Sequence, residues 1–373
     1  MSGFFAAPQG AAVLKHGILR RYLPVFATMT GSRAGEVVYL DAYAGPGLYN
    51  DGTPGSPALA LTTAQVVAGY KGKATLHGHL IEEDNQHFQD LAALLAEYGA
   101  TWDLHHGRAE DHILPILSDI EPTTPLFAFL DPFGLPIPFD MVQDILRRGR
   151  SRSGFGGAAT EVLLNFSIPA MNRVGGQLTG RGTSPRWLRA RDTMVAHMDQ
   201  VLGGDWWQAI WRSGAADRID QIRTGYKDRL RATGNWAVFD IDVADRWGGA
   251  PSYHLFLFTQ HEDGVWRFHE TLSSAEEEYR TYCHDHEGLL DLEPLKDREA
   301  RWTSTITDNV ERILAEGKQF KPVRRISDVY RGVFGEARQK HLRKAIERLH
   351  AAGKTSTNPK GVNDLSDLWI KPP

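Results

Sequence analysis

Acidic side chains and a pair of glycines follow the apolar segments in the first half of the chain. The acids that come after successive apolar segments are Asp41, Glu82, Glu110 and Asp131. Gly45 and Gly47 lie just beyond the first of these segments. Because glycine has no Cβ, the backbone there can adopt positive φ and a ligand can approach it closely. The pattern indicates a site for a nucleotide-like ligand, although a turn with two glycines also occurs where no ligand binds.

Strands and helices alternate around these residues. Apolar segments predict strands at residues 37–40, 74–81, 102–105, 126–130 and 161–166. Helices are expected at residues 14–29, 57–67, 85–98 and 139–148, with a short one ending at 117. This alternation predicts a parallel, doubly wound α/β sheet. The carboxyl ends of its strands meet at one edge, so the four acids should converge on one crevice.

We divide the chain into four parts. Residues 1–166 begin the α/β domain, 167–235 form a helical insertion, 236–295 complete the sheet through strands at 236–243 and 253–259, and 296–373 form a separate module. Helices at 306–315, 326–333 and 337–352, followed by a two-stranded wing, predict a winged-helix-like fold for this module. Its third helix is basic on one face, which fits nucleic acid binding and fits equally well a solvated helix in a protein-docking domain.

The composition is that of a soluble globular protein, with 42% hydrophobic and 24% charged residues in 373. A single cysteine excludes an internal disulfide and a zinc ribbon. No apolar run could span a bilayer and the N-terminus lacks a secretory signal, so we expect a cytoplasmic protein. The net charge of −4 is uneven: residues 296–373 carry 17 basic and 10 acidic residues, and the preceding part carries 25 and 36. A basic module beside an acidic body favours contact with a polyanion.

The order of these motifs is that of class I S-adenosylmethionine (SAM) methyltransferases. Glycines after the first strand can admit the methionine part of the cofactor, and a carboxylate such as Glu82 can accept both ribose hydroxyls. The interval from Gly47 to Glu82 exceeds the roughly 20 residues of the dinucleotide fingerprint, which disfavours a dehydrogenase. A P-loop is excluded because no Gly-Lys-Ser/Thr follows the first strand.

Asp131-Pro-Phe-Gly134 resembles the Asp/Asn-Pro-Pro-Tyr/Phe motif of amino-group methyltransferases. There the first side chain accepts a hydrogen bond from an exocyclic amine, and an aromatic ring stacks on a base held out of its helix. In this chain Phe133 replaces the second proline and Gly134 replaces the aromatic residue. Either Phe133 supplies the stacking face from a shifted position, or the amine pocket has been lost.

Several segments together resemble the three-Cys-motif partner (TcmP) family over most of the chain. They are residues 14–23 (LKHGILRRYL), 39–49 (YLDAYAGPGLY), 55–57 (GSP), 129–134 (FLDPFG) and 161–166 (EVLLNF). Members are described mainly by their pairing with a separate protein that carries three cysteines. The resemblance therefore implies such a partner for this chain.

A more distant resemblance is to the 23S ribosomal RNA adenine-N6 methyltransferases of the J type. They share a Leu-Lys-His helix, an Asp-x-x-Ala-Gly-x-Gly-x-Tyr turn, a Gly-Ser-Pro step and a catalytic Asp-Pro-Pro-Tyr. This resemblance implies Asp131 as the catalytic acceptor. Together the resemblances and the motif order give a predicted set of SAM-binding residues: Lys15, His16, Asp41, Tyr43, Gly45, Gly47, Ser56, Glu82, Ala109, Glu110 and Asp131.

Other candidate sites have less support. His77 and His79 point to one face of a strand, but the sequence shows no third metal ligand near them, so no metal site is predicted. For Cys283-His-Asp-His286 the sequence likewise shows no further ligand that would complete a metal site. Trp206-Trp207 is expected in a core or an interface. A serine or cysteine hydrolase finds no support, because no Gly-x-Ser-x-Gly occurs.

The sequence leaves two hypotheses. The first is a SAM-dependent N-methyltransferase that acts on an exocyclic amine of a nucleic acid base, with Asp131 orienting the amine, Phe133 packing on the base and the basic module binding phosphate. The second is a methyltransferase-like binding or scaffold protein whose altered Asp-Pro-Phe-Gly segment no longer transfers methyl groups. The sequence identifies neither the substrate nor the oligomeric state.

Overall fold

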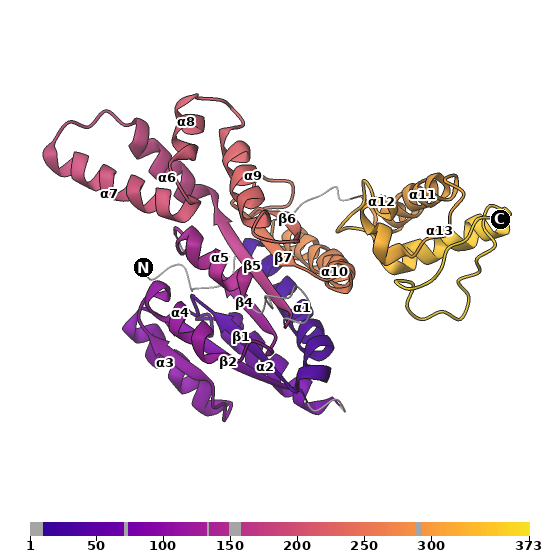
Figure 1. The fold of residues 1–373 in the computed structure, drawn as a ribbon, viewed down its shortest axis with the longest axis horizontal. Helices are drawn as coiled ribbons and strands as arrows, with labels where there is room; N and C mark the ends of the chain where they lie inside the picture. The colour runs from indigo at the N-terminus through magenta and orange to yellow at the C-terminus, as the bar shows by residue number, and fades with distance from the viewer. Residues whose placement is uncertain (1–9, 71–73, 133, 149–157, 288–292) are drawn as a thin grey trace. The chain divides into compact units, whose positions relative to one another are not determined.

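The computed structural model describes residues 10–70, 74–132, 134–148, 158–287 and 293–373. The chain forms two compact units that divide between Gln260 and His261, and Figure 1 traces both along the chain. The sequence predicts the boundary of the C-terminal module at residue 296 instead. Helix α10 (Glu262–Glu287), which follows the last strand, is thus grouped with the second unit. No helix in the described ranges is both long enough and apolar enough to cross a bilayer.

The first unit contains all seven predicted strands, each within one residue of its expected ends. They are β1 (Glu36–Asp41), β2 (Thr75–Glu82), β3 (Asp103–His106), β4 (Leu126–Leu130), β5 (Thr160–Ser167), β6 (Ala237–Val243) and β7 (Tyr253–Thr259). The helices described in this unit are α1 (Gly10–Ala34), α2 (Ser56–Gly69), α3 (Asn85–Glu97), α4 (Ala109–Asp119), α5 (Phe139–Arg147), α6 (Ile168–Thr179), α7 (Pro185–Leu202), α8 (Trp206–Arg212) and α9 (Arg218–Arg231). Helices α6 to α9 lie within residues 167–235, the segment predicted to be a helical insertion.

The strands form one mixed sheet in the order β3-β2-β1-β4-β5-β7-β6. Strands β1 to β5 pair in parallel, and β7 pairs antiparallel with both β5 and β6. Every residue of β4 is buried, as expected for a central strand covered on both faces. The predicted doubly wound α/β fold is thus confirmed, and the two late strands complete the sheet as an antiparallel pair.

Alternating side chains of β4 pack against different helices on the two faces of the sheet. Phe127 meets Tyr22 and Phe26 of α1, with ring centroids 6.1 and 5.5 Å apart. Ala128 belongs to the opposite core, where Val38 and Leu164 of the sheet pack with helices α4 to α9. Because successive strand residues face opposite ways, this division follows from the sequence of β4. It places α1 across the sheet from the insertion.

The second unit is helical and has its own core. Its elements are α10, α11 (Leu295–Leu314), the 3-10 helix η1 (Pro322–Arg325), α12 (Ile326–Val329) and α13 (Gln339–Ala351). The core includes the buried side chains of Trp266, Trp302 and Leu342. The second of the three predicted helices is shorter than expected, because α12 ends at Val329.

The predicted wing is irregular in the described residues. The hydroxyl of Thr357 donates to the carbonyl oxygen of Trp369 at 3.0 Å, and Thr355 donates to the carbonyl of Lys371. The segment containing Ile370 also forms an isolated antiparallel bridge with Phe320. The two wing segments therefore lie together, held partly by threonine side chains in place of a regular ladder of backbone hydrogen bonds.

Candidate functional site

A pocket lies at the carboxyl ends of β1 and β4, where a doubly wound sheet binds its ligands. The empty space within it is about 370 Å³, a figure that includes the part open to solvent. It is lined by Lys15 and His16 of α1, by residues 43–49 of the turn after β1, by Gly55 and Ser56 at the start of α2, and by Asp131 after β4. The structure thus brings together Lys15, His16, Tyr43, Gly45, Gly47, Ser56 and Asp131 from the predicted set.

The turn after β1 requires its glycines. Gly45 and Gly47 have φ of 64° and 85°, in the left-handed region that L side chains rarely adopt. A Cβ on Gly47 would also lie 2.5 Å from Cδ2 of Leu94 in α3. The backbone N–H of Gly55 donates to the carbonyl oxygen of Gly47 at 2.9 Å, which closes the loop against α2. The glycines thus let the backbone itself form one wall of the pocket.

Glu82, at the end of β2, holds this turn in place. Its Oε2 accepts a hydrogen bond from the backbone N–H of Gly45 at 2.7 Å, and its Oε1 accepts one from Asp84 at 2.7 Å. The carboxylate is buried and does not line the pocket. The structure therefore gives Glu82 a turn-fixing role beside the ribose-binding role expected from the sequence. Carboxylate oxygens can accept more than one hydrogen bond, so the two roles are compatible.

Asp41 is fully buried beneath the turn. Its Oδ2 accepts from the Tyr39 hydroxyl at 2.8 Å and its Oδ1 from the backbone N–H of Tyr43 at 3.2 Å. Burial raises the pKa of Asp41 to about 6, although hydrogen bonds from Ser56, Tyr39 and Tyr43 oppose the shift. Asp41 thus supports Tyr43 and Ser56, which line the pocket, without lining it itself.

Asp131 is held from two sides. Its Oδ2 forms an ion pair with Nζ of Lys15, and its Oδ1 accepts a hydrogen bond from Nδ2 of Asn165 at 2.8 Å. Only 9% of the Lys15 side chain and 12% of the Asp131 side chain are exposed, so the pair is shielded from water. Asn165 was missed as a site residue. Its one sequence signal is a polar side chain within the apolar strand Val-Leu-Leu-Asn-Phe.

His16 lies beside this ion pair and is neutral at physiological pH. Burial lowers its pKa to about 3, and the neighbouring Lys15 charge adds to the shift. The ring meets Tyr49 edge to face, with centroids 5.8 Å apart. His16 therefore offers the pocket an uncharged hydrogen-bonding ring next to Lys15.

The remaining predicted residues lie elsewhere or outside the described residues. Ala109 is buried at the first position of α4, and Glu110 pairs with Arg108 at 3.0 Å; neither lines the pocket. Phe133 lies outside the described residues. Trp207 is fully buried and donates its indole N–H to Asp199 at 2.7 Å, which confirms its expected core position.

Comparisons with known proteins give a distant structural likeness. No family model matches the chain, and no curated protein sequence matches it. The O-methyltransferase TomG from Streptomyces achromogenes has a TM-score of 0.31 at 14% identity, over 66% of this chain and 80% of TomG. An O-methyltransferase from Bacillus cereus gives 0.31 at 10%, over 64% and 80%. The Methanococcus jannaschii fibrillarin pre-rRNA processing protein gives 0.28 at 11%, over 60% and 65%.

Replacing Asp41 by Asn should remove a pH dependence of stability. A folded-state pKa of about 6, against 3.8 for a free carboxyl, means that the folded state favours the protonated form. Stability from this group is present below pH 4 and is lost as the pH rises through 6. Urea unfolding should therefore find the variant as stable as wild type at pH 4, and more stable by about 3 kcal/mol at pH 8. A variant less stable by a constant amount at every pH would contradict this.

Proposed function

We propose that this chain is a SAM-dependent N-methyltransferase that acts on an exocyclic amine of a nucleic acid base. The observation that carries the proposal is the position of Asp131, held by Lys15 and Asn165 at the edge of a pocket that the glycine turn lines. The sheet supports it, because an antiparallel β7 between β5 and β6 is the strand arrangement of class I SAM methyltransferases.

The contacts around the turn fit the cofactor. Positive φ at Gly47 leaves room for the methionine part against the backbone, and Ser56 and neutral His16 can hydrogen-bond its polar groups. When bound, SAM would supply an electrophilic methyl group. The residues proposed to hold it are Lys15, His16, Tyr43, Gly45, Gly47, Ser56 and, from beneath the turn, Asp41 and Glu82. Ala109 and Glu110, at the start of α4, remain part of the proposed set.

The residues proposed to contact the substrate, Asp131 and Phe133, would orient an amine. Transfer to an amine requires that its N–H groups point at acceptors, so that the nitrogen lone pair faces the methyl group. Asp131 offers such an acceptor, and Phe133 would stack on the base. The buried Oδ1 of Asn165 lacks a hydrogen-bond partner among the described residues. An unpaired buried acceptor costs stability, so a donor that reached this oxygen would be bound favourably.

One observation favours a second candidate, a scaffold protein that has lost methyl transfer. Both oxygens of Asp131 already have partners, because Lys15 pairs with one and Asn165 donates to the other. The ammonium group of Lys15 thus occupies an oxygen of Asp131 that the substrate amine would need. The chain would then act by binding, with the three-cysteine protein that the TcmP resemblance implies as its partner.

Replacing Gly47 by Ala should abolish SAM binding. The added Cβ meets Leu94 and is strained at positive φ, so the wall of the pocket must move. Isothermal titration should show micromolar binding to wild type and a loss of at least tenfold in the variant. Gly35→Ala is the matched control: its φ is 80°, but no atom lies within 4 Å of the added Cβ. No heat with wild type would remove the enzyme proposal.

Replacing Asp131 by Ala should abolish methyl transfer, because the acceptor for the substrate amine is removed. Protein, SAM labelled on the methyl group, and mixed RNA and DNA would be incubated with and without a three-cysteine-motif protein. Incorporation lost in the variant, but kept in the exposed control Asp228→Ala, supports catalysis. No incorporation by wild type in any mixture, with SAM binding intact, would instead favour the scaffold.

The second unit would bind the nucleic acid through α13. Lys340, Lys344 and Arg348 recur at four-residue spacing and so form one row on the helix. Lys340 pairs with Glu299, whereas Lys344 and Arg348 are exposed. Arg343 is used otherwise, because it donates to the carbonyl oxygens of Pro359 and Val362 in the wing segment. The row fits the phosphate backbone of a nucleic acid.

Charge reversal at Lys344 and Arg348 together should weaken binding to RNA or DNA by at least tenfold at low salt. The slope of log K against log salt should also fall by about 1 for each phosphate contact removed. Reversal at the exposed Lys296 and Lys318 changes net charge equally and serves as the control. Binding that does not depend on salt, or equal losses in both variants, would argue against this surface.

A further inference from the structure

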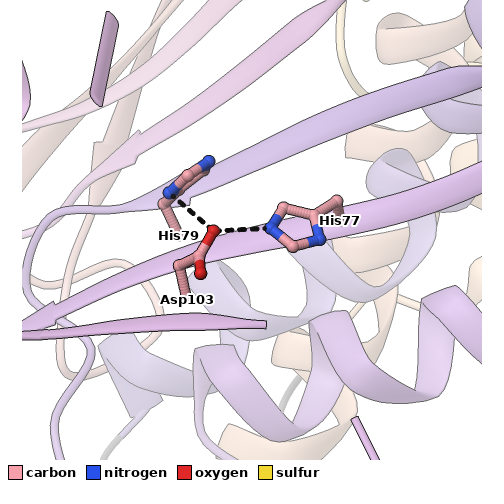
Figure 2. A group of neighbouring side chains, drawn as sticks. All are labelled: His77, His79 and Asp103. Carbon is pink, nitrogen blue, oxygen red and sulfur yellow. Dashed lines mark hydrogen bonds and ion pairs between the residues drawn. The ribbon is translucent and has the colours of Figure 1, made fainter. Parts of the chain in front are cut away.

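A cluster of histidines with one carboxylate lies at the edge of the sheet, outside the pocket. Figure 2 shows His77 and His79 on β2 and Asp103 on β3, with their side chains pointing toward one another. The Nε2 of His77 lies 2.9 Å from Oδ2 of Asp103, and Nδ1 of His79 lies 3.6 Å from the same oxygen. One donor atom from each residue falls within 4.8 Å of the others.

The pairing of β2 with β3 brings the donors together. His79 is directly opposite Asp103 in the parallel register, so their side chains lie on the same face, and His77 joins them two residues earlier. His105 is two residues beyond Asp103, and its Nε2 lies 3.3 Å from Nδ1 of His79. Asp103, the third ligand that the sequence alone did not show, therefore comes from the neighbouring strand β3. His105 of the same strand lies beside it.

The distances match a single small cation. In a tetrahedral zinc site with bonds of 2.0–2.1 Å, neighbouring donor atoms are roughly 3.3–3.5 Å apart. Three of the donor separations, 2.9, 3.6 and 3.3 Å, lie around this value, and without an ion the first and third are hydrogen bonds. Imidazole nitrogens with one carboxylate oxygen are ligands that Zn²⁺ and similar transition metals accept, whereas Mg²⁺ and Ca²⁺ prefer oxygen alone.

The cluster is accessible from solvent. The Asp103 side chain is 55% exposed and that of His77 28%, which leaves a path for an ion. Helix α4 adds His112, whose ring centroid lies 5.4 Å from that of His105.

A second group, made of two carboxylates and one histidine, provides a contrast. Asp240, Asp242 and His254 also approach one another, but Arg223 and Lys227 already neutralise Asp240 at 2.7 and 2.6 Å. Two cations at the carboxylate exclude a third. In the described residues no lysine or arginine pairs with Asp103, so its charge has only the histidines as partners.

We propose that His77, His79 and Asp103, with His105 as a fourth donor, bind one Zn²⁺-class transition metal ion. The ion would join β3, the edge strand, to β2 near its centre. Its role would be structural, because the donors leave the strands before the carboxyl ends at which the pocket lies. The site is independent of the proposed methyl transfer.

The test uses the full chain without a polyhistidine tag, stripped with EDTA and dialysed. Titration with ZnCl₂ should give one ion per chain, and Co²⁺ should give the intense visible absorption of a four-coordinate site. His79→Gln and Asp103→Asn should each weaken binding on the order of 100-fold, since even residues that only orient metal ligands contribute 10–100-fold. The thermal midpoint should rise with Zn²⁺ in wild type but not in these variants.

The matched control is His106→Gln, which removes a histidine from the opposite face of the same strand and should bind Zn²⁺ as wild type does. Circular dichroism without metal checks that each variant is folded, and the exposed Asp103→Asn is the variant least able to disturb folding. Wild type that binds less than one Zn²⁺ at micromolar concentrations would overturn the proposal. So would Asp103→Asn and His79→Gln variants that bind as tightly as wild type.

Discussion

The carboxylate of Glu82 fixes the end of β2 to the turn after β1, and the geometry of the pocket depends on this contact. One oxygen accepts the N–H of Gly45 and the other accepts the N–H of Asp84. A turn at positive φ leaves backbone donors pointing inward, where a buried unpaired N–H would be costly. Glu82 satisfies the donor of Gly45 and thereby permits the conformation that places Gly47 against α3. The remaining wall, from Lys15 to Ser56, is assembled around this turn.

The buried ion pair between Lys15 and Asp131 also lines this pocket. A lysine and an aspartate removed from water gain little net stability from each other, but losing either partner leaves an uncompensated charge. Here Asn165 also donates a hydrogen bond to Asp131, and packing of α1 on Phe127 holds Lys15 in place. The pair thus maintains a charged acceptor in a shielded site, the environment in which hydrogen bonds to a substrate are strongest. Whether substrate or Lys15 occupies that acceptor separates the two candidate functions.

Several basic side chains of the second unit form ion pairs with acidic side chains of the same unit. Of its basic residues, Arg325 pairs with Glu316 and Lys354 pairs with Glu311, so these do not contribute a free cationic surface. The excess of positive charge counted in the sequence is therefore not spread evenly over the unit. The row on α13 carries exposed cations at Lys344 and Arg348. The net positive charge of the C-terminal module predicts a polyanion ligand. The ion pairs within the unit narrow the surface that would bind this ligand to the row on α13.

Apolar alternation and the absence of a Cβ are local properties, so the residues alone predicted the strands, their alternation with helices, and the glycine turn. The sequence also placed Asp131 after β4. The residues that contact Asp131 depend on how the chain folds, because Asn165 is 34 positions away and Lys15 is 116 positions away. The tertiary structure likewise gave Glu82 backbone partners and brought Asp103 to His77 and His79. Contacts between strands depend on pairing register, which a single strand's residues do not encode.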